Sequence, residues 1–149
     1  MTKQITDFTL VGKQTYSRSV LLTLRSDHSL PDIVAGQFVQ VLVDDSPQTF
    51  LRRPISIHDV DSLHNEISLL VQQVGEGTRH LAGVSKGGSI NLVLPLGNGF
   101  TLPERGEKVA LVGGGIGIAP LFYLAKVLKE KGVHSVLLLG GRSKSDLLR

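Results

Sequence analysis

The sequence predicts a mainly β fold with an α/β addition, namely an antiparallel barrel or sandwich followed by one β-α-β unit. Short alternating apolar segments, separated by Gly, Pro and Asp turn signals, fill the first part of the chain. After Pro103–Gly106 the pattern changes to an apolar strand, a glycine-rich loop, leucines at helical spacing and a second apolar strand. We therefore expect a barrel domain over residues 1–102, a linker at 103–106, and the first part of an α/β domain over 107–149.

Composition places the chain among ordinary folded proteins. Hydrophobic residues make up 41% of the 149 residues and charged residues 19%. No apolar run approaches the roughly 20 residues of a membrane helix, and no signal peptide is apparent, so we expect a cytoplasmic location. A net charge of +3 with 5% aromatic residues argues against nucleic-acid binding. The absence of cysteine excludes disulfides, thiolate catalysis and cysteine-held clusters within this chain, and the histidines have no metal-ligand spacing.

Period-two alternation defines the strands of the first domain. The expected strands are Gln4–Val11, Ser19–Arg25, Phe38–Val43, the strand that begins at Arg53, Glu66–Val74 and Ser89–Leu94. One face of these strands carries the sets Val20, Leu22 and Leu24; Val39, Val41 and Val43; Ile67, Leu69 and Val71; and Ile90, Leu92 and Leu94. Ser26–Gly36 reads as a loop, Asp44–Pro47 as a break and His58–Asn65 as a hairpin-like turn. A closed or nearly closed barrel would bury the apolar faces and leave no open edge.

The stretch Leu51–Ile57 puts a cation, a rigid proline and a hydroxyl close together on one strand. Arginine suits a phosphate, since its planar fork donates two hydrogen bonds and stays charged. Pro54 marks a strand start or an edge. The alternative is an edge strand with a solvated pair, Arg52 and Arg53.

Two glycine-bearing turns follow in the barrel. Gly75–Thr78 opens a short helical stretch, Arg79–Val84, in which Leu81 faces the barrel mouth. Its amides, with the Thr78 hydroxyl, can face an anion, or the turn is a plain one capped by threonine. Pro95–Phe100 is expected to close the barrel with a core phenylalanine.

A strand, Lys108–Val112, leads into the glycine loop Gly113–Gly117. Such a loop at a helix start suits a pyrophosphate, although it matches neither the G-x-G-x-x-G fingerprint nor a P-loop. Pro120 belongs in the first helical turn, and Gly132 ends the helix. The helix buries Leu121, Leu124, Ala125 and Leu128, and the strand Val136–Leu139 has the composition of one buried on both faces.

These motifs occur in an order that resembles the ferredoxin-NADP reductase superfamily. The four segments are Arg53–Ser56, Gly75–Thr78, Pro95–Phe100 and Gly113–Leu121. Within the superfamily, the sequence is most similar to electron-transfer subunits of type B (NAD-dependent) dihydroorotate dehydrogenase, over essentially the whole chain. The resemblance implies a six-stranded antiparallel Greek-key barrel that binds FAD, followed by the first β-α-β unit of a doubly wound nicotinamide-nucleotide domain.

The resemblance also implies roles for residues around the flavin. Arg53 would contact the FAD pyrophosphate, and Ser56 would lie near the flavin N5 edge. Ile55 stands where many members have a tyrosine stacked on the flavin, so the contact here would be aliphatic. Gly113–Gly117 would face the nicotinamide nucleotide.

A second group of residues would complete the FAD site. Leu70, Val71 and Gln72 would line the ribityl and adenine side, while Gly77 and Thr78 would bind the pyrophosphate through amide and hydroxyl donors. No residue is assigned a catalytic role and no metal site is expected. The expected cofactor-binding set is Arg53, Pro54, Ile55, Ser56, Leu70, Val71, Gln72, Gly77, Thr78, Gly113, Gly114, Gly115 and Gly117.

The implied function is electron transfer between NAD and a dihydroorotate dehydrogenase catalytic subunit, through FAD and an iron–sulfur centre, in pyrimidine synthesis. The partner would be that catalytic subunit, in a heterotetramer. Because the chain has no cysteine, we expect it to be C-terminally truncated, with the 2Fe-2S centre in the missing region. Two alternatives stay open: a reductase subunit of another complex of this superfamily, hydrogenase-linked or ferredoxin-NADP, and a non-catalytic barrel interaction module. NAD and NADP are not distinguished, since Arg142 and Ser143 suit either a 2′-phosphate or a turn.

Overall fold

The computed structural model describes residues 3–44, 49–104 and 106–143. The predicted break at Asp44–Pro47 and the predicted linker residue Arg105 therefore lie partly or wholly outside the described residues. The elements are β1 (Gln4–Thr15), β2 (Ser19–Arg25), β3 (Phe38–Val41), β4 (Arg53–Asp61), β5 (Glu66–Gln72), α1 (Glu76–Gly83), β6 (Ser89–Leu96), β7 (Val109–Gly114), the 3-10 turn η1 (Gly115–Ile118), α2 (Leu121–Glu130) and β8 (Ser135–Gly140).

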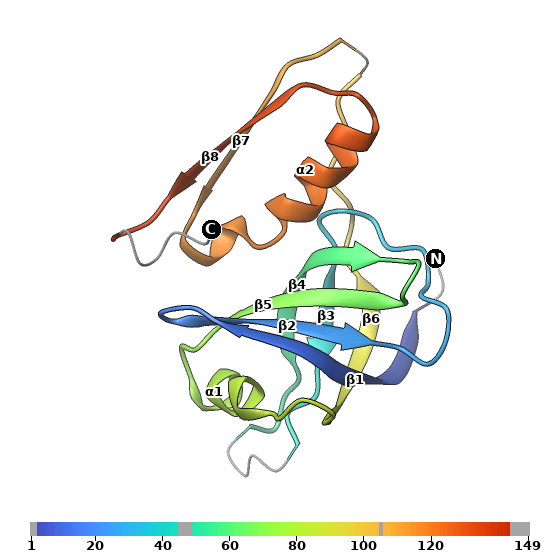
Figure 1. Cartoon of the computed structure of the whole chain (residues 1–149), viewed down its shortest axis with the longest axis vertical. Coiled ribbons are helices and arrows are strands. Elements are labelled where there is room, and N and C mark those ends of the chain that lie inside the picture. The colour runs from blue at the N-terminus through green and yellow to red at the C-terminus, as the bar shows by residue number, and fades with distance from the viewer. Residues whose placement is uncertain (1–2, 45–48, 105, 144–149) are drawn as a thin grey trace.

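Six antiparallel strands close into a barrel in the order β1-β2-β5-β4-β3-β6 (Figure 1). The fold class expected from the sequence is thereby confirmed. All four predicted apolar sets are buried, and together with Phe8, Leu10 and Ile57 they form one core. Strand β4 lies between β5 and β3, but its pairing with β5 begins only at Ile57, so the segment from Arg53 to Ser56 has a paired strand, β3, on one side only.

Helix α1 and the turn that follows β6 pack against the barrel. Leu81 of α1 is 2% exposed and joins the barrel core, as predicted. Phe100 is 41% exposed, so it is not the core residue that we expected. Its amide donates to the Ala35 carbonyl at 2.8 Å, and a Cβ on Gly36, whose φ is +103°, would lie 2.9 Å from the Phe100 nitrogen.

The second unit consists of the parallel pair β7–β8 and the helix α2 that connects them. Helix α2 lies between this sheet and the barrel (Figure 1). Its buried residues Leu121, Leu124 and Leu128 recur at helical spacing and pack with Leu111 of β7 and with Ala35 from the barrel. The helix ends at Glu130, and Gly132, two residues later, has a φ of +70° and donates its amide to the Lys129 carbonyl, which agrees with the predicted stop at this glycine.

Strand β8 is not buried on both faces, contrary to the expectation from its apolar run. The side chains of Val136 and Leu138 are 48% and 54% exposed, and Leu137 and Leu139 are 41% and 39% exposed. Only α2 covers this sheet among the described residues, so the face that carries Val112 and Leu138 has no layer against it. Neither α1, with 8 residues, nor α2, with 10, is long enough to cross a bilayer, and no other described helix is.

Candidate functional site

Two adjacent arginines of the β4 segment have different surroundings. Arg52 donates to the carbonyl oxygens of Gln40 and Asn91, both at 3.3 Å, and to the Asn91 side chain, so it ties β3 to β6 and is not merely solvated. The half-buried Arg53 has no hydrogen-bond or ion-pair partner among the described residues. The alternation of a strand sends the two side chains to opposite faces. Arg53 is therefore the member of the pair that is available for a ligand.

Arg53 lies against the N-terminus of α1. A Cβ built on Gly77 would meet the Arg53 Nε at 3.1 Å and the Thr49 Cγ2 at 3.0 Å, so the guanidinium and the helix backbone approach closely. The first amides of a helix have no intrahelical acceptor and carry the positive end of its dipole. The Arg53 guanidinium and the first amides of α1 therefore lie together. A pyrophosphate requires this combination of a cation and amide donors.

Thr78 contributes differently from the expectation. Its hydroxyl accepts from the amides of Val74 and Gly75 and donates to the Gly75 carbonyl, each at 3.0 Å. The proton of this hydroxyl is therefore committed to the helix start, and the alternative of a threonine-capped turn is correct for the side chain. The Gly77 and Thr78 amides remain as the donors at this position.

An open groove of about 360 Å³ runs from α1 along the barrel wall to η1. Most of the cofactor residues expected from the sequence line it. Its walls are Arg53, Pro54, Ile55, Ser56, Leu70, Gln72, Val74, Thr78, Ile116, Gly117 and Pro120. Half-buried Ile55 also packs on the barrel core, so it presents a fixed aliphatic surface to the groove.

Two of the expected residues, Val71 and Gly113, are buried in the packing of the protein instead of facing a cavity. Val71 is 0% exposed and belongs to the barrel core, because it alternates with Leu70 and Gln72 on β5. Gly113 is buried, and a Cβ there would lie 2.7 Å from the Leu121 Cδ1 and 2.9 Å from the Ile118 Cγ2. Its lack of a side chain thus serves the packing of α2 on β7.

A second cavity, of about 540 Å³, lies at the glycine loop. Gly114 and Gly115 line it with Gly140, which ends the neighbouring strand. Helix α2 begins only at Leu121, after η1, so its N-terminus does not follow the glycines directly as the sequence suggested. Gln72 and Ile116 line both this cavity and the groove. The two cavities are thus neighbours that share a wall.

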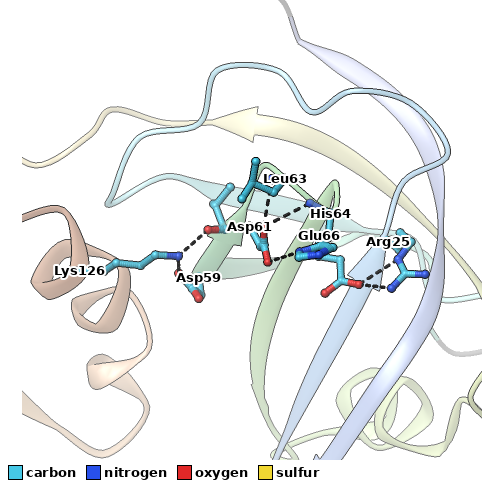
Figure 2. A network of polar contacts seen from close by, with 8 residues as sticks. Arg25, Asp59, Asp61, Leu63, His64, Glu66 and Lys126 are labelled. Atoms are coloured by element: carbon cyan, nitrogen blue, oxygen red, sulfur yellow. Dashed lines mark hydrogen bonds and ion pairs between the residues drawn. The ribbon is translucent and has the colours of Figure 1, made fainter. Parts of the chain in front are cut away.

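The barrel and the second unit are joined by contacts that sequence reasoning did not identify. The Lys126 Nζ on α2 donates to the Asp59 Oδ1 at 3.0 Å and to the Val60 carbonyl at 2.8 Å (Figure 2). Tyr123 donates its hydroxyl to the Ile33 carbonyl at 3.1 Å. These contacts link α2 to β4 and to the loop before β3, and they hold the second unit against the groove.

His58 is the central residue of this junction, where we had expected a surface or turn residue. Its Nδ1 lies 2.8 Å from the Ala119 carbonyl, and its ring stacks on Phe122 with centroids 4.8 Å apart. A carbonyl only accepts, so Nδ1 carries the proton. Burial lowers the pKa of His58 below its ordinary value and so favours a neutral ring. The hydrogen bond to Ala119 and the charge of Asp59 act in the opposite direction.

The remaining ionisable groups with shifted pKa values or ion pairs lie outside the groove residues. Burial raises the pKa of Tyr123, while the nearby Lys126 acts in the opposite direction. The Asp61–His64 and Arg25–Glu66 pairs lie on the barrel surface (Figure 2). Within residues 3–44, 49–104 and 106–143, no three His, Asp or Glu side chains gather as metal ligands.

Comparison with known proteins found relatives similar in sequence and solved structures similar in fold, whereas no protein-family model matches the sequence. The electron transfer subunit of dihydroorotate dehydrogenase B (NAD(+)) of Bacillus velezensis is 46% identical over 114 residues, which are 75% of this chain and 44% of that protein. The corresponding subunit of Streptococcus thermophilus is 37% identical over 146 residues, or 97% of this chain and 56% of that protein.

Among solved structures, an NADH-dependent reduced ferredoxin-NADP oxidoreductase, described for flavin-based electron bifurcation, superposes with a TM-score of 0.84 at 30% identity. That match covers 95% of this chain and 51% of the solved one. The chain spans about half the length of the curated relatives that it matches. It is thus a homologue, over that length, of the electron transfer subunits of NAD-dependent dihydroorotate dehydrogenase B, with a ferredoxin-NADP reductase-like fold.

Proposed function

We propose that this chain binds FAD in the groove along β4, with the pyrophosphate at Arg53 and the α1 amides and the flavin ring over Ile55. The single observation that carries the proposal is the unpaired Arg53 guanidinium, which lies against the Gly77 backbone at one end of the groove. Charge-assisted hydrogen bonds to such a group contribute about 1.5 to 3 kcal/mol each. The site therefore suits a cofactor that is held tightly.

The position of the groove supports an electron-transfer role in the longer protein. FAD supplies the redox chemistry when bound, because it exchanges two electrons with a nicotinamide and single electrons with an iron–sulfur centre. We propose that Ser56, which lines the groove, donates a hydrogen bond to the flavin edge. Gln72 and Ile116 line both the groove and the glycine-loop cavity, which supports a nicotinamide site beside the flavin. A nicotinamide nucleotide in that cavity would lie beside the flavin.

We further propose that the longer protein passes electrons between NAD and a dihydroorotate dehydrogenase catalytic subunit in pyrimidine synthesis, as part of a heterotetramer. The names of the curated relatives support this assignment. Since the chain contains no cysteine, a cysteine-held 2Fe-2S centre would lie outside these 149 residues. Co-purification tests the partner: a dihydroorotate dehydrogenase catalytic subunit is expected, and a hydrogenase subunit in its place would contradict the assignment.

The FAD site is tested by titrating the flavin-free protein with FAD and following flavin fluorescence. Arg53→Ala should weaken FAD binding about 10- to 150-fold, which is the loss of one charge-assisted bond of about 1.5 to 3 kcal/mol. Lys86→Ala removes the same charge from an exposed position after α1 and serves as the control. A colourless protein that does not bind FAD, or an Arg53→Ala variant with unchanged affinity, would contradict the proposal.

A further inference from the structure

The first residues of β4 are paired with one neighbouring strand only. Strand β3 pairs with β4 from Ser56 back to Arg53, and Arg53 lies opposite Val41, the last residue of β3. On the other side of β4, the pairing with β5 begins only at Ile57. Arg53 therefore occupies the last position of the β3–β4 ladder, and the ends of such ladders open most easily. A side chain at this position needs a further support if it is to keep one place.

Arg52 provides hydrogen bonds beyond the end of this ladder. Its guanidinium donates to the carbonyl oxygens of Gln40 on β3 and Asn91 on β6, both at 3.3 Å, and to the side-chain oxygen of Asn91. The planar fork of an arginine holds several acceptors in one fixed geometry, whereas the single ammonium of a lysine does not. The residue directly before Arg53 is thus tied to two strands at once.

Asn91, which accepts two of these three bonds, is itself fixed in the barrel. Its carbonyl oxygen also accepts from the Leu42 amide at 2.9 Å, and its side-chain nitrogen donates to the Asp7 Oδ1 on β1 at 2.7 Å. Asn91 lies opposite Asp7 in the β1–β6 ladder. A chain of hydrogen bonds therefore runs from Arg52 through Asn91 to Asp7. It connects the start of β4 with β3, β6 and β1.

The adjacent Arg53 has no such bonds of its own. Its half-buried guanidinium has no hydrogen-bond or ion-pair partner among the described residues, and its Nε would lie 3.1 Å from a Cβ built on Gly77. The position of this side chain therefore depends on the backbone that carries it. A fixed backbone limits the places that the guanidinium can take, which reduces the entropy lost when it binds a ligand.

The two adjacent arginines therefore have different tasks. We propose that Arg52 is a positioning residue for FAD: by tying the start of β4 to β3, β6 and β1, it holds Arg53 where the FAD pyrophosphate binds. Arg52 is not among the residues that line the groove, so it acts through Arg53 and not by contact with the cofactor. This inference rests on the proposed function, since it concerns the residue that holds the pyrophosphate.

The test is a double-mutant cycle at Arg52 and Arg53, in which FAD is titrated into the flavin-free full-length protein. Arg52→Ala should raise the dissociation constant for FAD about 2- to 12-fold, the range expected when one long side chain has to be ordered on binding. In the Arg53→Ala background the same change should have almost no effect, because the side chain that Arg52 positions is gone. Arg52→Lys keeps the charge but not the fork, so it should weaken binding nearly as much as Arg52→Ala does.

Arg25→Ala is the matched control. Arg25 also forms hydrogen bonds across two barrel strands, to Glu66, but it does not line the groove, so this variant should bind FAD as the wild type does. Urea denaturation of the flavin-free variants measures the stability of each. A general loss of stability would weaken FAD binding with or without Arg53, whereas a positioning effect is confined to proteins that contain Arg53.

The possible outcomes separate this inference from the proposed function. The inference alone is overturned if Arg53→Ala weakens FAD binding but Arg52→Ala leaves it unchanged. It is also overturned if Arg52→Ala weakens binding equally in both backgrounds, if Arg52→Lys restores the wild-type affinity, or if Arg25→Ala has the same effect. A wild-type protein that does not bind FAD, or an Arg53→Ala variant with unchanged affinity, contradicts the proposed function itself.

Discussion

Replacement of Gly77 by alanine is expected to separate the stability of the barrel from its affinity for FAD. Gly77 is buried in the first turn of α1, and its φ lies outside the left-handed region, so alanine fits the backbone. The new Cβ would lie 3.0 Å from the Thr49 Cγ2 and 3.1 Å from the Arg53 Nε, where ordinary contacts are 3.4 to 4 Å. Both neighbours must therefore give way by a few tenths of an ångström.

The two expected effects have opposite signs. Alanine in place of glycine stabilises a helix by up to about 1 kcal/mol, and the crowding at Thr49 offsets part of this gain. The free energy of unfolding should therefore change by less than about 1 kcal/mol. The displaced Arg53 would lose a charge-assisted bond of about 1.5 to 3 kcal/mol, which corresponds to a roughly 10- to 150-fold weaker affinity for FAD.

Gly83→Ala provides a matched control within the same helix. A Cβ at Gly83, the last residue of α1, would meet no atom within 4 Å, so this variant changes helix propensity alone. Urea denaturation of the flavin-free proteins measures stability, and quenching of flavin fluorescence measures the dissociation constant. If Gly77→Ala binds FAD as tightly as Gly83→Ala does, the position of Arg53 against α1 does not determine pyrophosphate binding, and our reasoning is refuted.

Two further predictions concern the junction between the barrel and α2. Lys126→Met should lower the free energy of unfolding by about 1 kcal/mol, which is the upper range for a partly exposed ion pair such as Lys126–Asp59. Lys129→Met should have little effect. A double-mutant cycle of Lys126→Met with Asp59→Asn measures the coupling, and a coupling of zero would contradict the prediction. Burial lowers the pKa of folded His58 below its ordinary value of 6.5, so the unfolded chain binds more protons and stability should fall as pH drops through 6.5. His58→Asn should flatten that decrease in a series of thermal melts, and an unchanged slope would show that another group causes it.

Much of the fold could be predicted because its signals are local. Alternation along a strand depends only on neighbouring residues, and the set Val20, Leu22 and Leu24 is accordingly buried in the barrel core. Helical spacing likewise identified Leu121 and Leu128 as the buried face of α2. The extent of strands was less predictable: β1 continues to Thr15 because it pairs with β2 as far as Val20, and that pairing is not a local property.

The errors have a common physical cause, which is that burial of a side chain depends on what packs against it. Strand β8 has the apolar composition of a doubly covered strand, yet only α2 lies on its sheet among the described residues. Val71 was assigned to the cofactor although its alternation with Leu70 already directed it into the core. His58 looked like a turn residue because Ala119 and Phe122, its partners, are about sixty positions away in the chain.

By itself, the sequence determined the barrel strands, the helix and the residue types that a phosphate needs, since composition and periodicity act over a few positions. Only the tertiary structure decided which of these residues meet. It left Arg53 without a partner beside Gly77 while it paired Arg52 with Asn91. It also brought Arg18 and Arg142 to the lining of one cavity. Closing a barrel and docking a second unit bring together residues that are far apart in the sequence, and no local pattern encodes that proximity.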